Sequence, residues 1–250
     1  MIRTLLRSLC FYRPKFRGVT DFLHFVRAIQ QNRLVSCDVD KEPRALPPSD
    51  LPRLSIVCVS YKRYKEIHVL INSILSQTCG AWELIVIHDG PDENMRHLAE
   101  TYVRSDARIR YFETKDRFND FGHSLRDWGM TLANGDYLLI TNDDNYYAPT
   151  FVEYMLRAAC QDELDFVLCD MVHNHRFPGR YRSLPYEVFV SVPRKHFIDI
   201  GNFIVKSSIA QKAGFKGRDF DADGDFVDAI IRQNPRLRLG KVHKILYVHN

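Results

Sequence analysis

Short apolar runs alternate with amphipathic stretches from about residue 54 onward. The runs Leu54–Val59 and Leu84–Ile87 have the length of buried strands. Between them, apolar residues recur three and four positions apart, as on one face of a helix: Ile67, Leu70, Ile71, Ile74 and Leu75. The pattern therefore predicts a strand, a helix and a second strand in this order.

The alternation continues along the chain. The same spacing predicts helices around 98–103 and 125–132, and strands near 109–112 and 137–140. A further strand is expected at 201–206, followed by a short helix at 207–213. Strands that alternate with helices indicate right-handed βαβ units. We therefore expect an α/β fold with a Rossmann-like, mainly parallel central sheet and helices on both faces.

The N-terminal region differs from this pattern. Residues 1–36 carry seven lysines and arginines against the single acid Asp21, whereas the rest of the chain, whose net charge is +4, is nearly balanced. Apolar stripes at helical spacing over 2–9 and 22–29 predict two short amphipathic helices. Four prolines between Lys41 and Pro52 then forbid regular structure. The sequence predicts a basic helical arm and linker at 1–50 and one globular domain at 51–250.

The arm has two interpretations. A basic helix with an apolar face can lie on an anionic membrane surface, or its apolar stripes can dock on the rest of the protein. No stretch is long and apolar enough to span a bilayer, and the six cysteines form no C-x-x-C pair. We expect a cytoplasmic protein, with peripheral binding at the inner face of the membrane as one of the two interpretations.

The residues just past each strand are the first candidates for a site, because ligands bind at the carboxyl ends of parallel strands. The first strand ends in Ser60-Tyr61-Lys62-Arg63, which has no glycine and so excludes a dinucleotide fingerprint and a P-loop. The second ends in His88-Asp89-Gly90. Its carboxylate could accept hydrogen bonds from a ribose or a uracil imide, or could simply belong to an Asp-Gly turn.

Two further groups of carboxylates lie beyond these strands. Asp143 and Asp144 come directly after the strand at 137–140. A polar turn would explain them, but Mg²⁺ or Mn²⁺ also takes one or two protein carboxylates and fills its other positions with phosphate oxygens and water. The second group lies at 219–225, before an apolar helical stretch, where acids also stabilise a helix N-terminus.

Together, these segments resemble the family-2 glycosyltransferases of the GT-A fold, especially the spore-coat polysaccharide type. The similarity covers about residues 53–250 and rests on ordered segments: the opening strand Leu54–Tyr61, the helix end Ser73–Thr78, the second strand Trp82–Asp89, Gly135–Tyr137, and Thr141–Pro149, which resembles the family's DXD metal motif. The resemblance implies an inverting, Mn²⁺- or Mg²⁺-dependent transfer of a sugar from a nucleotide diphosphate, with a UDP-sugar as the expected donor, to an acceptor hydroxyl.

The resemblance also implies roles at the nucleotide and metal. Asp89 would bind the uracil, Asp143 the ribose and Asp144 the metal ion. Ser60 and Tyr61 would border the base and the ribose. These five side chains would thus form the donor half of the site.

The resemblance leaves two candidates for the general base. The resemblance points to Asp223, but Ala222 stands where many members have glutamate, which leaves Asp225 as the alternative. His88 stands where the family usually has a first aspartate. His249 matches a C-terminal position where some members supply a metal-binding histidine, although a lone surface histidine would look the same.

The expected partners are a UDP-sugar donor and a carbohydrate or lipid-linked saccharide acceptor, in polysaccharide or glycoconjugate synthesis. The arginine-rich segment Arg176–Arg182 falls where the acceptor half is expected. A catalytically silent nucleotide-sugar-binding or interaction protein of the same fold is the alternative, and a sugar nucleotidyltransferase would need a glycine-rich loop after the first strand. Nucleic acid is not expected as a partner, because the chain carries no recognised nucleic-acid motif.

Overall fold

A mixed β-sheet forms the centre of the structure, a computed structural model that describes residues 35–36, 51–174, 186–217 and 222–250. Its strands are β1 (Val35–Ser36), β2 (Leu54–Ser60), β3 (Trp82–His88), β4 (Ile109–Glu113), β5 (Tyr137–Asn142), β6 (Tyr146–Tyr147), β7 (Phe166–Asn174), β8 (Tyr186–Phe189), β9 (Phe203–Lys206) and β10 (Leu239–His249). They follow the order β1-β10-β7-β9-β5-β2-β3-β4, with β6 beside β10 and β8 beside β7.

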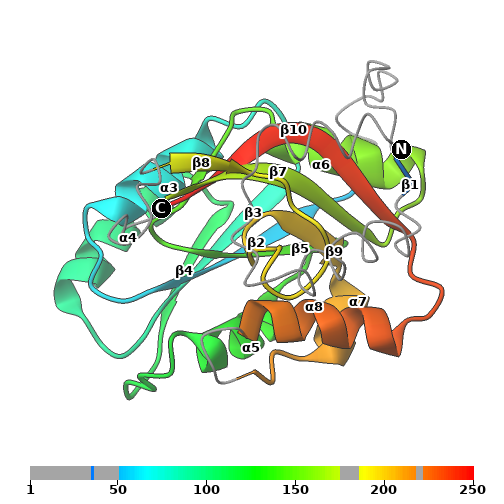
Figure 1. Cartoon of the computed structure of the whole chain (residues 1–250). Helices are drawn as coiled ribbons and strands as arrows, with labels where there is room; N and C mark the ends of the chain where they lie inside the picture. The colour runs from blue at the N-terminus through cyan, green and yellow to red at the C-terminus, as the bar shows by residue number, and fades with distance from the viewer. Residues whose placement is uncertain (1–34, 37–50, 175–185, 218–221) are drawn as a thin grey trace.

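The described helices cover both faces of this sheet (Figure 1). They are α3 (Glu66–Leu75), α4 (Glu93–Ser105), α5 (His123–Leu132), α6 (Phe151–Gln161), α7 (Ser207–Ala213) and α8 (Ala222–Gln233). Buried apolar residues of α3, α4 and α6 belong to one hydrophobic cluster, and buried apolar residues of α5, α7 and α8 belong to another. The α/β fold with helices on both faces is therefore confirmed.

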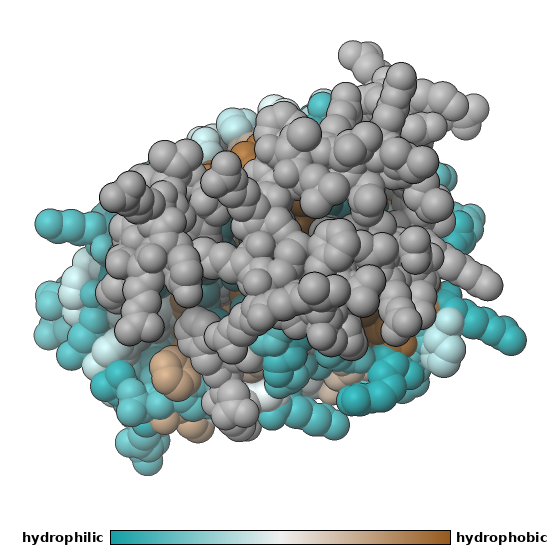
Figure 2. Space-filling model, viewed as in Figure 1, coloured by the Kyte–Doolittle hydropathy of each residue, from teal (hydrophilic) through white to brown (hydrophobic). Residues whose placement is uncertain are grey.

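Strand β2 shows why the central strands are mostly apolar. All seven of its residues are buried. Ile56 and Cys58 belong to the cluster under α3, whereas Val57 and Val59 belong to the cluster under α5. Because successive side chains of a strand point to opposite faces, a strand covered on both sides reads as a continuous apolar run. On the face shown in Figure 2, the described rim is largely hydrophilic, as expected when these residues lie inside.

The predicted elements from residue 54 to 142 are confirmed in order and type. Strands β2 to β5 are parallel to their neighbours within this group. Helix α4 begins earlier than its apolar residues suggest, because the Asp92 side chain accepts a hydrogen bond from the Met95 amide and caps it. Strand β9 runs antiparallel between β5 and β7, so the sheet is parallel mainly in its β2–β5 half and at β7–β10.

Most of the predicted arm lies outside the described residues, and so does the segment Arg176–Arg182. Within the range assigned to the arm and linker, β1 pairs in parallel with β10 through Val35 and Ser36. In the described part of the chain, no helix has the length and apolarity needed to cross a bilayer.

A buried carboxylate ties the amino ends of the central strands together. Glu83 accepts hydrogen bonds from the Ser55 hydroxyl (2.6 Å), the Asn134 amide (2.8 Å) and the Arg110 guanidinium (3.2 Å). Ser55 in turn accepts from the Gly135 amide at 2.7 Å. Burial alone would raise the pKa of Glu83, but these hydrogen bonds and the neighbouring arginines hold it below its usual value. This network links β2, β3, β4 and the turn before β5.

We predict that Glu83→Gln lowers the free energy of unfolding by about 1.5–3 kcal/mol at pH 7, because hydrogen bonds to a charged group are lost. Since the pKa of Glu83 is lower in the folded state, its stabilisation is complete above about pH 5 and is lost as the pH falls through the folded pKa. The difference in the free energy of unfolding between the wild type and Glu83→Gln must therefore become smaller at acidic pH. Urea unfolding across this pH range measures it.

The matched control for this prediction is Glu100→Gln. Glu100 lies on α4, is partly exposed and pairs with Arg104 at 2.9 Å. Its removal should change the stability by about 0.5 kcal/mol or less, as for other surface pairs. Equal losses in the two variants would contradict the role assigned to Glu83.

Candidate active site

Three predicted segments meet at one edge of the sheet. Ser60 of β2 is in register with His88 of β3, and Val59 is in register with Asn142 of β5. The residues just beyond these strands are therefore neighbours. The C-terminal end of β10 reaches the same place, because β10 pairs with β6 and the Asn250 amide donates to the Asn145 side chain at 3.4 Å.

Asp143 and Asp144 lie at this edge and are buried, with only 3% and 7% of their surface exposed. Asp143 accepts a hydrogen bond from the Tyr61 amide at 3.3 Å. The Arg63 guanidinium donates to Asp143 at 3.3 Å and forms an ion pair with Asp144. Burial raises the pKa of Asp143 to about 6. Two carboxylates thus share a buried position that is already suited to positive charge.

The donor set fits a hard divalent cation that also binds phosphate. In the described residues, no three histidine, cysteine or carboxylate side chains are gathered as a ready-made metal cluster. Mg²⁺ and Mn²⁺ do not require one, because they bind through one or two carboxylates and complete their coordination with substrate phosphates and water. The guanidinium of Arg63 is a stand-in cation on these carboxylates. Asp143 and Asp144 would hold the ion.

The Tyr61 ring contacts two other side chains. His88 stacks on it with 5.8 Å between ring centroids, and the Arg117 guanidinium lies 3.8 Å from its centroid. The predicted nucleotide-binding residue Ser60 is buried directly before Tyr61.

His88 holds the turn that carries Tyr61 and Arg63. Its Nδ1 lies 2.7 Å from the Gly90 carbonyl oxygen, and its Nε2 accepts from the Lys62 amide at 3.1 Å. A carbonyl only accepts and an amide only donates, so the proton of His88 is on Nδ1 and the ring is neutral in this arrangement. The backbone of Lys62 has a φ of 55°, in the left-handed region, and the hydrogen bond from its amide to His88 stabilises this conformation.

Asp89 anchors the loop after β4. Its two oxygens accept from the amides of Phe118 (2.7 Å) and Asn119 (3.0 Å). Arg117 adds a longer contact of 3.8 Å to the same carboxylate. The Asp89 amide donates to the Ser60 carbonyl oxygen at 3.0 Å, which fixes Asp89 beside β2. The residue predicted to read the uracil therefore also shapes the loop beside Tyr61.

The two candidate bases differ in their surroundings. Asp223 lies in the first turn of α8 and accepts a hydrogen bond from the Ile200 amide; burial, and next the Asp199 carboxylate, raise its pKa to about 6. Asp225 is more exposed and pairs with the Lys195 ammonium at 2.7 Å. Only one of the two carboxylates thus lies in the buried acidic region.

His249 lies in the same region. Its Nε2 is 3.4 Å from an oxygen of Asp199, and its ring stacks on His173 with 4.4 Å between centroids. Asp199 also accepts from the Tyr247 hydroxyl at 2.7 Å. His249 is therefore part of a structured cluster next to the Asn145–Asn250 contact, and is more enclosed than an isolated surface histidine.

Two residues of the site were missed in the sequence. Arg126 is buried on α5 and donates to the Asn142 side chain at 2.8 Å and to the Phe121 carbonyl at 3.0 Å. Its position beside Leu125 on the buried face of an amphipathic helix is a signal that could have revealed it. Asp199 lies in an irregular segment before β9, where no pattern distinguishes it from other loop acids.

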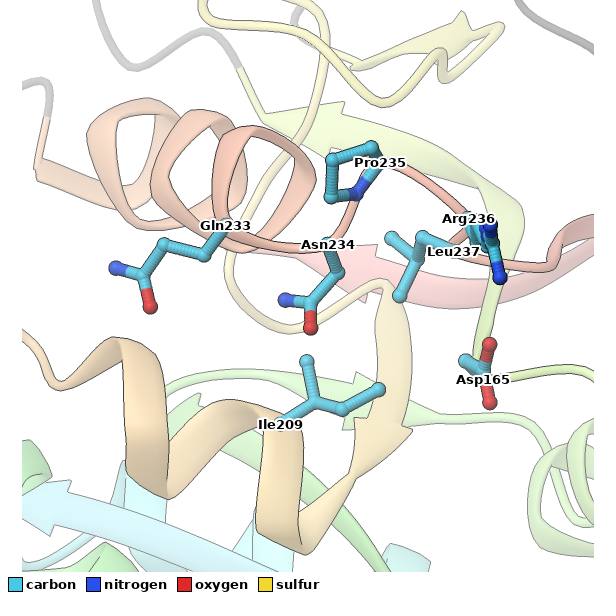
Figure 3. A pocket seen from close by; sticks show the side chains of 7 residues that line it. All are labelled: Asp165, Ile209, Gln233, Asn234, Pro235, Arg236 and Leu237. Carbon is cyan, nitrogen blue, oxygen red and sulfur yellow. The ribbon is translucent and has the colours of Figure 1, made fainter.

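A hollow of about 400 Å³ lies away from this site (Figure 3). Its lining consists of Asp165, Ile209, Gln233, Asn234, Pro235, Arg236 and Leu237. Asp165 directly precedes β7, and β7 runs in the direction of β5 because both are antiparallel to β9. The hollow is therefore at the amino ends of these strands, on the opposite edge from Asp143.

The profile of a family described as Glycosyl transferase family 2 matches residues 55–216. EpsH of Bacillus subtilis, named as a glycosyltransferase, is 25% identical over 150 residues, which are 60% of this chain and 42% of that protein. The uncharacterized glycosyltransferase EpsJ of the same organism is 31% identical over 119 residues, or 48% and 34% of the two chains. The chain thus spans about two fifths or less of these relatives' length.

Two solved structures share the fold. The crystal structure of S. aureus TarS 1–349 in complex with UDP-GlcNAc superposes with a TM-score of 0.63 at 16% identity, over 78% of this chain and 58% of that one. Mannosyltransferase PcManGT from Pyrobaculum calidifontis, in complex with GDP-Man and Mn²⁺, gives a TM-score of 0.64 at 16% identity, over 91% and 64% of the chains. The fold is GT-A, as expected from the sequence.

Asp89→Ala tests the anchoring of the loop. We predict that amide hydrogen exchange of Phe118 and Asn119 becomes at least about tenfold faster, because each loses its acceptor. Asp92→Ala is the matched control, since it removes a carboxylate that caps α4 and should accelerate exchange near Met95 only. Unchanged exchange at 118–119 in Asp89→Ala would show that other contacts hold the loop.

Proposed function

The chain belongs to glycosyl transferase family 2, and from this premise we propose that it is an inverting, metal-dependent enzyme that transfers a sugar from a UDP-sugar to an acceptor hydroxyl. The single observation that carries the proposal is the buried pair Asp143–Asp144 beside Tyr61 at the carboxyl edge of the sheet. The TarS structure contains UDP-GlcNAc and the PcManGT structure contains GDP-Man and Mn²⁺, which supports a nucleotide-sugar donor and a divalent cation here.

The proposed donor half uses the residues at this edge. Asp144 and Asp143 would hold Mn²⁺ or Mg²⁺, with Asp143 also facing the ribose and Ser60 and Tyr61 bordering the nucleoside. A divalent cation bound there would counter the charge that develops on the leaving diphosphate. Asp89 is proposed to read the uracil through a remaining lone pair, so Asp89→Ala should weaken binding of UDP but not of pyrophosphate in calorimetry.

The proposed reaction is one displacement. The acceptor oxygen forms a bond to the anomeric carbon while the bond from that carbon to the diphosphate oxygen breaks, and the leaving group takes the electron pair. The acceptor proton passes to a carboxylate on the opposite face of the sugar. A single displacement inverts the anomeric configuration and requires no protein nucleophile.

Asp223 is the proposed base, and two features favour it over Asp225. Its burial and the nearby Asp199 raise its pKa toward neutrality, which suits a group that must accept a proton at physiological pH. Asp225 is instead paired with the Lys195 ammonium at 2.7 Å, so one of its oxygens is already engaged by a side chain of the protein. Arg126 and His249, which both lower the pKa of Asp223, would keep part of it ionised.

His249 is proposed as an additional metal ligand. Asp199 lies beside its Nε2, an arrangement in which a carboxylate orients a ligating imidazole. The other nitrogen, Nδ1, is buried without a hydrogen-bond partner in the described part of the chain and is the free donor atom. His249→Ala should weaken Mn²⁺ affinity, measured by calorimetry in the presence of UDP, and unchanged affinity would exclude this ligand.

We predict that Asp144→Asn abolishes Mn²⁺- or Mg²⁺-dependent binding of UDP while the fold remains intact. The amide keeps the size of the side chain but removes the charge that a hard cation needs. Calorimetry with UDP at fixed Mn²⁺ measures the loss. Asp116→Asn, an exposed carboxylate on the loop after β4, is the control and should bind as the wild type does. Full metal-dependent affinity in Asp144→Asn would remove Asp144 from the site.

For the base, we predict that Asp223→Asn lowers kcat by about 10²-fold or more while donor affinity is nearly unchanged, because the group acts on the acceptor proton in the transition state. Asp225→Asn should be milder, and Asp228→Asn, an exposed acid on the same helix, should be neutral. Single-turnover transfer to an identified acceptor distinguishes them. If Asp225→Asn is slow and Asp223→Asn is not, the two roles are exchanged.

A catalytically silent nucleotide-sugar binder is the competing proposal. Both predict metal-dependent UDP affinity, so binding alone cannot separate them. Screening a panel of nucleotide sugars for metal-dependent hydrolysis does, because even without acceptor an active enzyme slowly transfers its sugar to water. Turnover that is lost in Asp223→Asn favours the enzyme, and affinity without turnover of any donor favours the binder.

The acceptor and the membrane belong to the proposal as well. We propose a carbohydrate or lipid-linked saccharide acceptor, used in polysaccharide or glycoconjugate synthesis, and contact of residues 1–36 with an anionic membrane from the cytoplasmic side. The excess of basic residues in this segment supports it. Deletion of residues 1–34 should therefore reduce cosedimentation with anionic liposomes but leave UDP binding in place. Equal cosedimentation of the two proteins would refute the membrane contact.

A further inference from the structure

A positively charged side chain of the protein lies on the carboxylates assigned to the metal. The Arg63 guanidinium donates to Asp143 at 3.3 Å and pairs with Asp144. The carboxylates are deeply buried, whereas 42% of the Arg63 side chain is exposed. The carboxylates of this ion pair are therefore fixed in the protein, whereas the Arg63 side chain has space to rotate away from them.

The backbone that carries Arg63 is fixed even though its side chain is not. The Tyr61 amide is bonded to Asp143, and the Lys62 amide to His88. The Arg63 carbonyl accepts from the Ile67 amide at 3.2 Å, which joins it to the first turn of α3. Departure of the guanidinium thus needs only side-chain rotation, while the turn keeps its place.

Electrostatics explains why a cation is needed there. Two adjacent carboxylates that are buried together repel one another, and burial makes the charged form of each costly. An arginine can bridge both, because its planar group presents several donors. A divalent cation bound to the same oxygens would bring greater charge, and both cations cannot occupy the same lone pairs.

We propose that Arg63 is a built-in counter-ion that neutralises Asp143 and Asp144 while the site is empty and competes with the divalent cation for them. Metal binding displaces the guanidinium from the carboxylates. This inference rests on the proposed function, because it takes Asp144 as a metal ligand. Arg63 is thus a positioning residue. It offsets the repulsion between the two carboxylates when no metal is bound, and it lowers the affinity of the site for the metal.

The proposal predicts two effects of opposite sign for Arg63→Gln. Without metal, the carboxylates lose their counter-ion, so the melting temperature should fall by about 2–4 °C. With Mn²⁺ alone and no nucleotide, the dissociation constant should fall by about tenfold, because the competitor is gone. Titration of Mn²⁺ followed by the electron paramagnetic resonance signal of the free ion measures the second effect.

Lys65→Gln is the matched control. Lys65 lies two residues further along the same turn, is exposed and precedes α3 without a side-chain capping bond. Its replacement removes the same charge from the same segment but no contact with the carboxylates. We expect its Mn²⁺ affinity to stay within about twofold of the wild type, and its melting temperature to be unchanged.

The outcomes are separable. Tighter Mn²⁺ binding in Arg63→Gln than in Lys65→Gln, with a lower melting temperature without metal, supports the proposal. Equal affinity in these two variants, or weaker binding in Arg63→Gln, overturns it. If Arg63→Gln does not fold, Arg63→Lys, whose single ammonium bridges the pair less well, must itself bind Mn²⁺ more tightly than the wild type does, or the proposal fails.

The proposed function has its own control in a second Mn²⁺ titration, carried out with UDP present. Asp144→Asn should lose Mn²⁺ binding in the presence of UDP. If it retains this binding, Asp144 is not a ligand and the metal assignment itself fails, whatever Arg63 does. If Asp144→Asn loses binding while Arg63→Gln behaves like Lys65→Gln, the metal site stands and only the competition is wrong.

Discussion

The register of β2 against β3 and β5 is the constraint on which the site depends. These strands are buried on both faces, so a slip of one residue would turn apolar side chains from one cluster into the other. The Ser55–Glu83 hydrogen bond fixes the register at the amino ends. At the other edge, the same register places Ser60 beside His88 and sets Asp143 next to the turn after β2. The packing of the apolar strands therefore fixes the positions of the polar side chains at the carboxyl edge of the sheet.

Charge accumulates at this edge because several chain segments end there. Asp143 and Asp144 come after β5, Asp199 precedes β9 and Asp223 lies in the first turn of α8. Burial is the largest cause of the raised pKa values of Asp143 and Asp223, so the protein holds these groups where their ionised forms are costly. Positive groups offset part of this cost. A site built in this way is suited to a bound cation together with a ligand that forms hydrogen bonds.

Local patterns predicted the elements from β2 to β5, because buried strands and amphipathic helices obey simple periodicities. The carboxylates after β5 were found for the same reason, since recognising a strand also locates the polar residues at its carboxyl end. Arg126 and Asp199 were missed, since their partners come from distant parts of the chain, such as Asn142 and Tyr247. The long pairing of β10 with β7 was also not predicted, because no local signal states which strands will be neighbours.

The segment at 219–225 shows where sequence reasoning reached its limit. Helical geometry separates positions 223 and 225 by roughly 200°, so the sequence establishes that they face different ways but not which one faces inward. In the structure, Gly224 packs closely on Lys195: an added Cβ would lie 2.6 Å from its side chain. That contact brings Lys195 within 2.7 Å of Asp225 and leaves Asp223 on the side of Ile200. The distinction between the two acids thus depends on Lys195, a tertiary neighbour some thirty residues away in the sequence. The local sequence pattern does not predict such a contact.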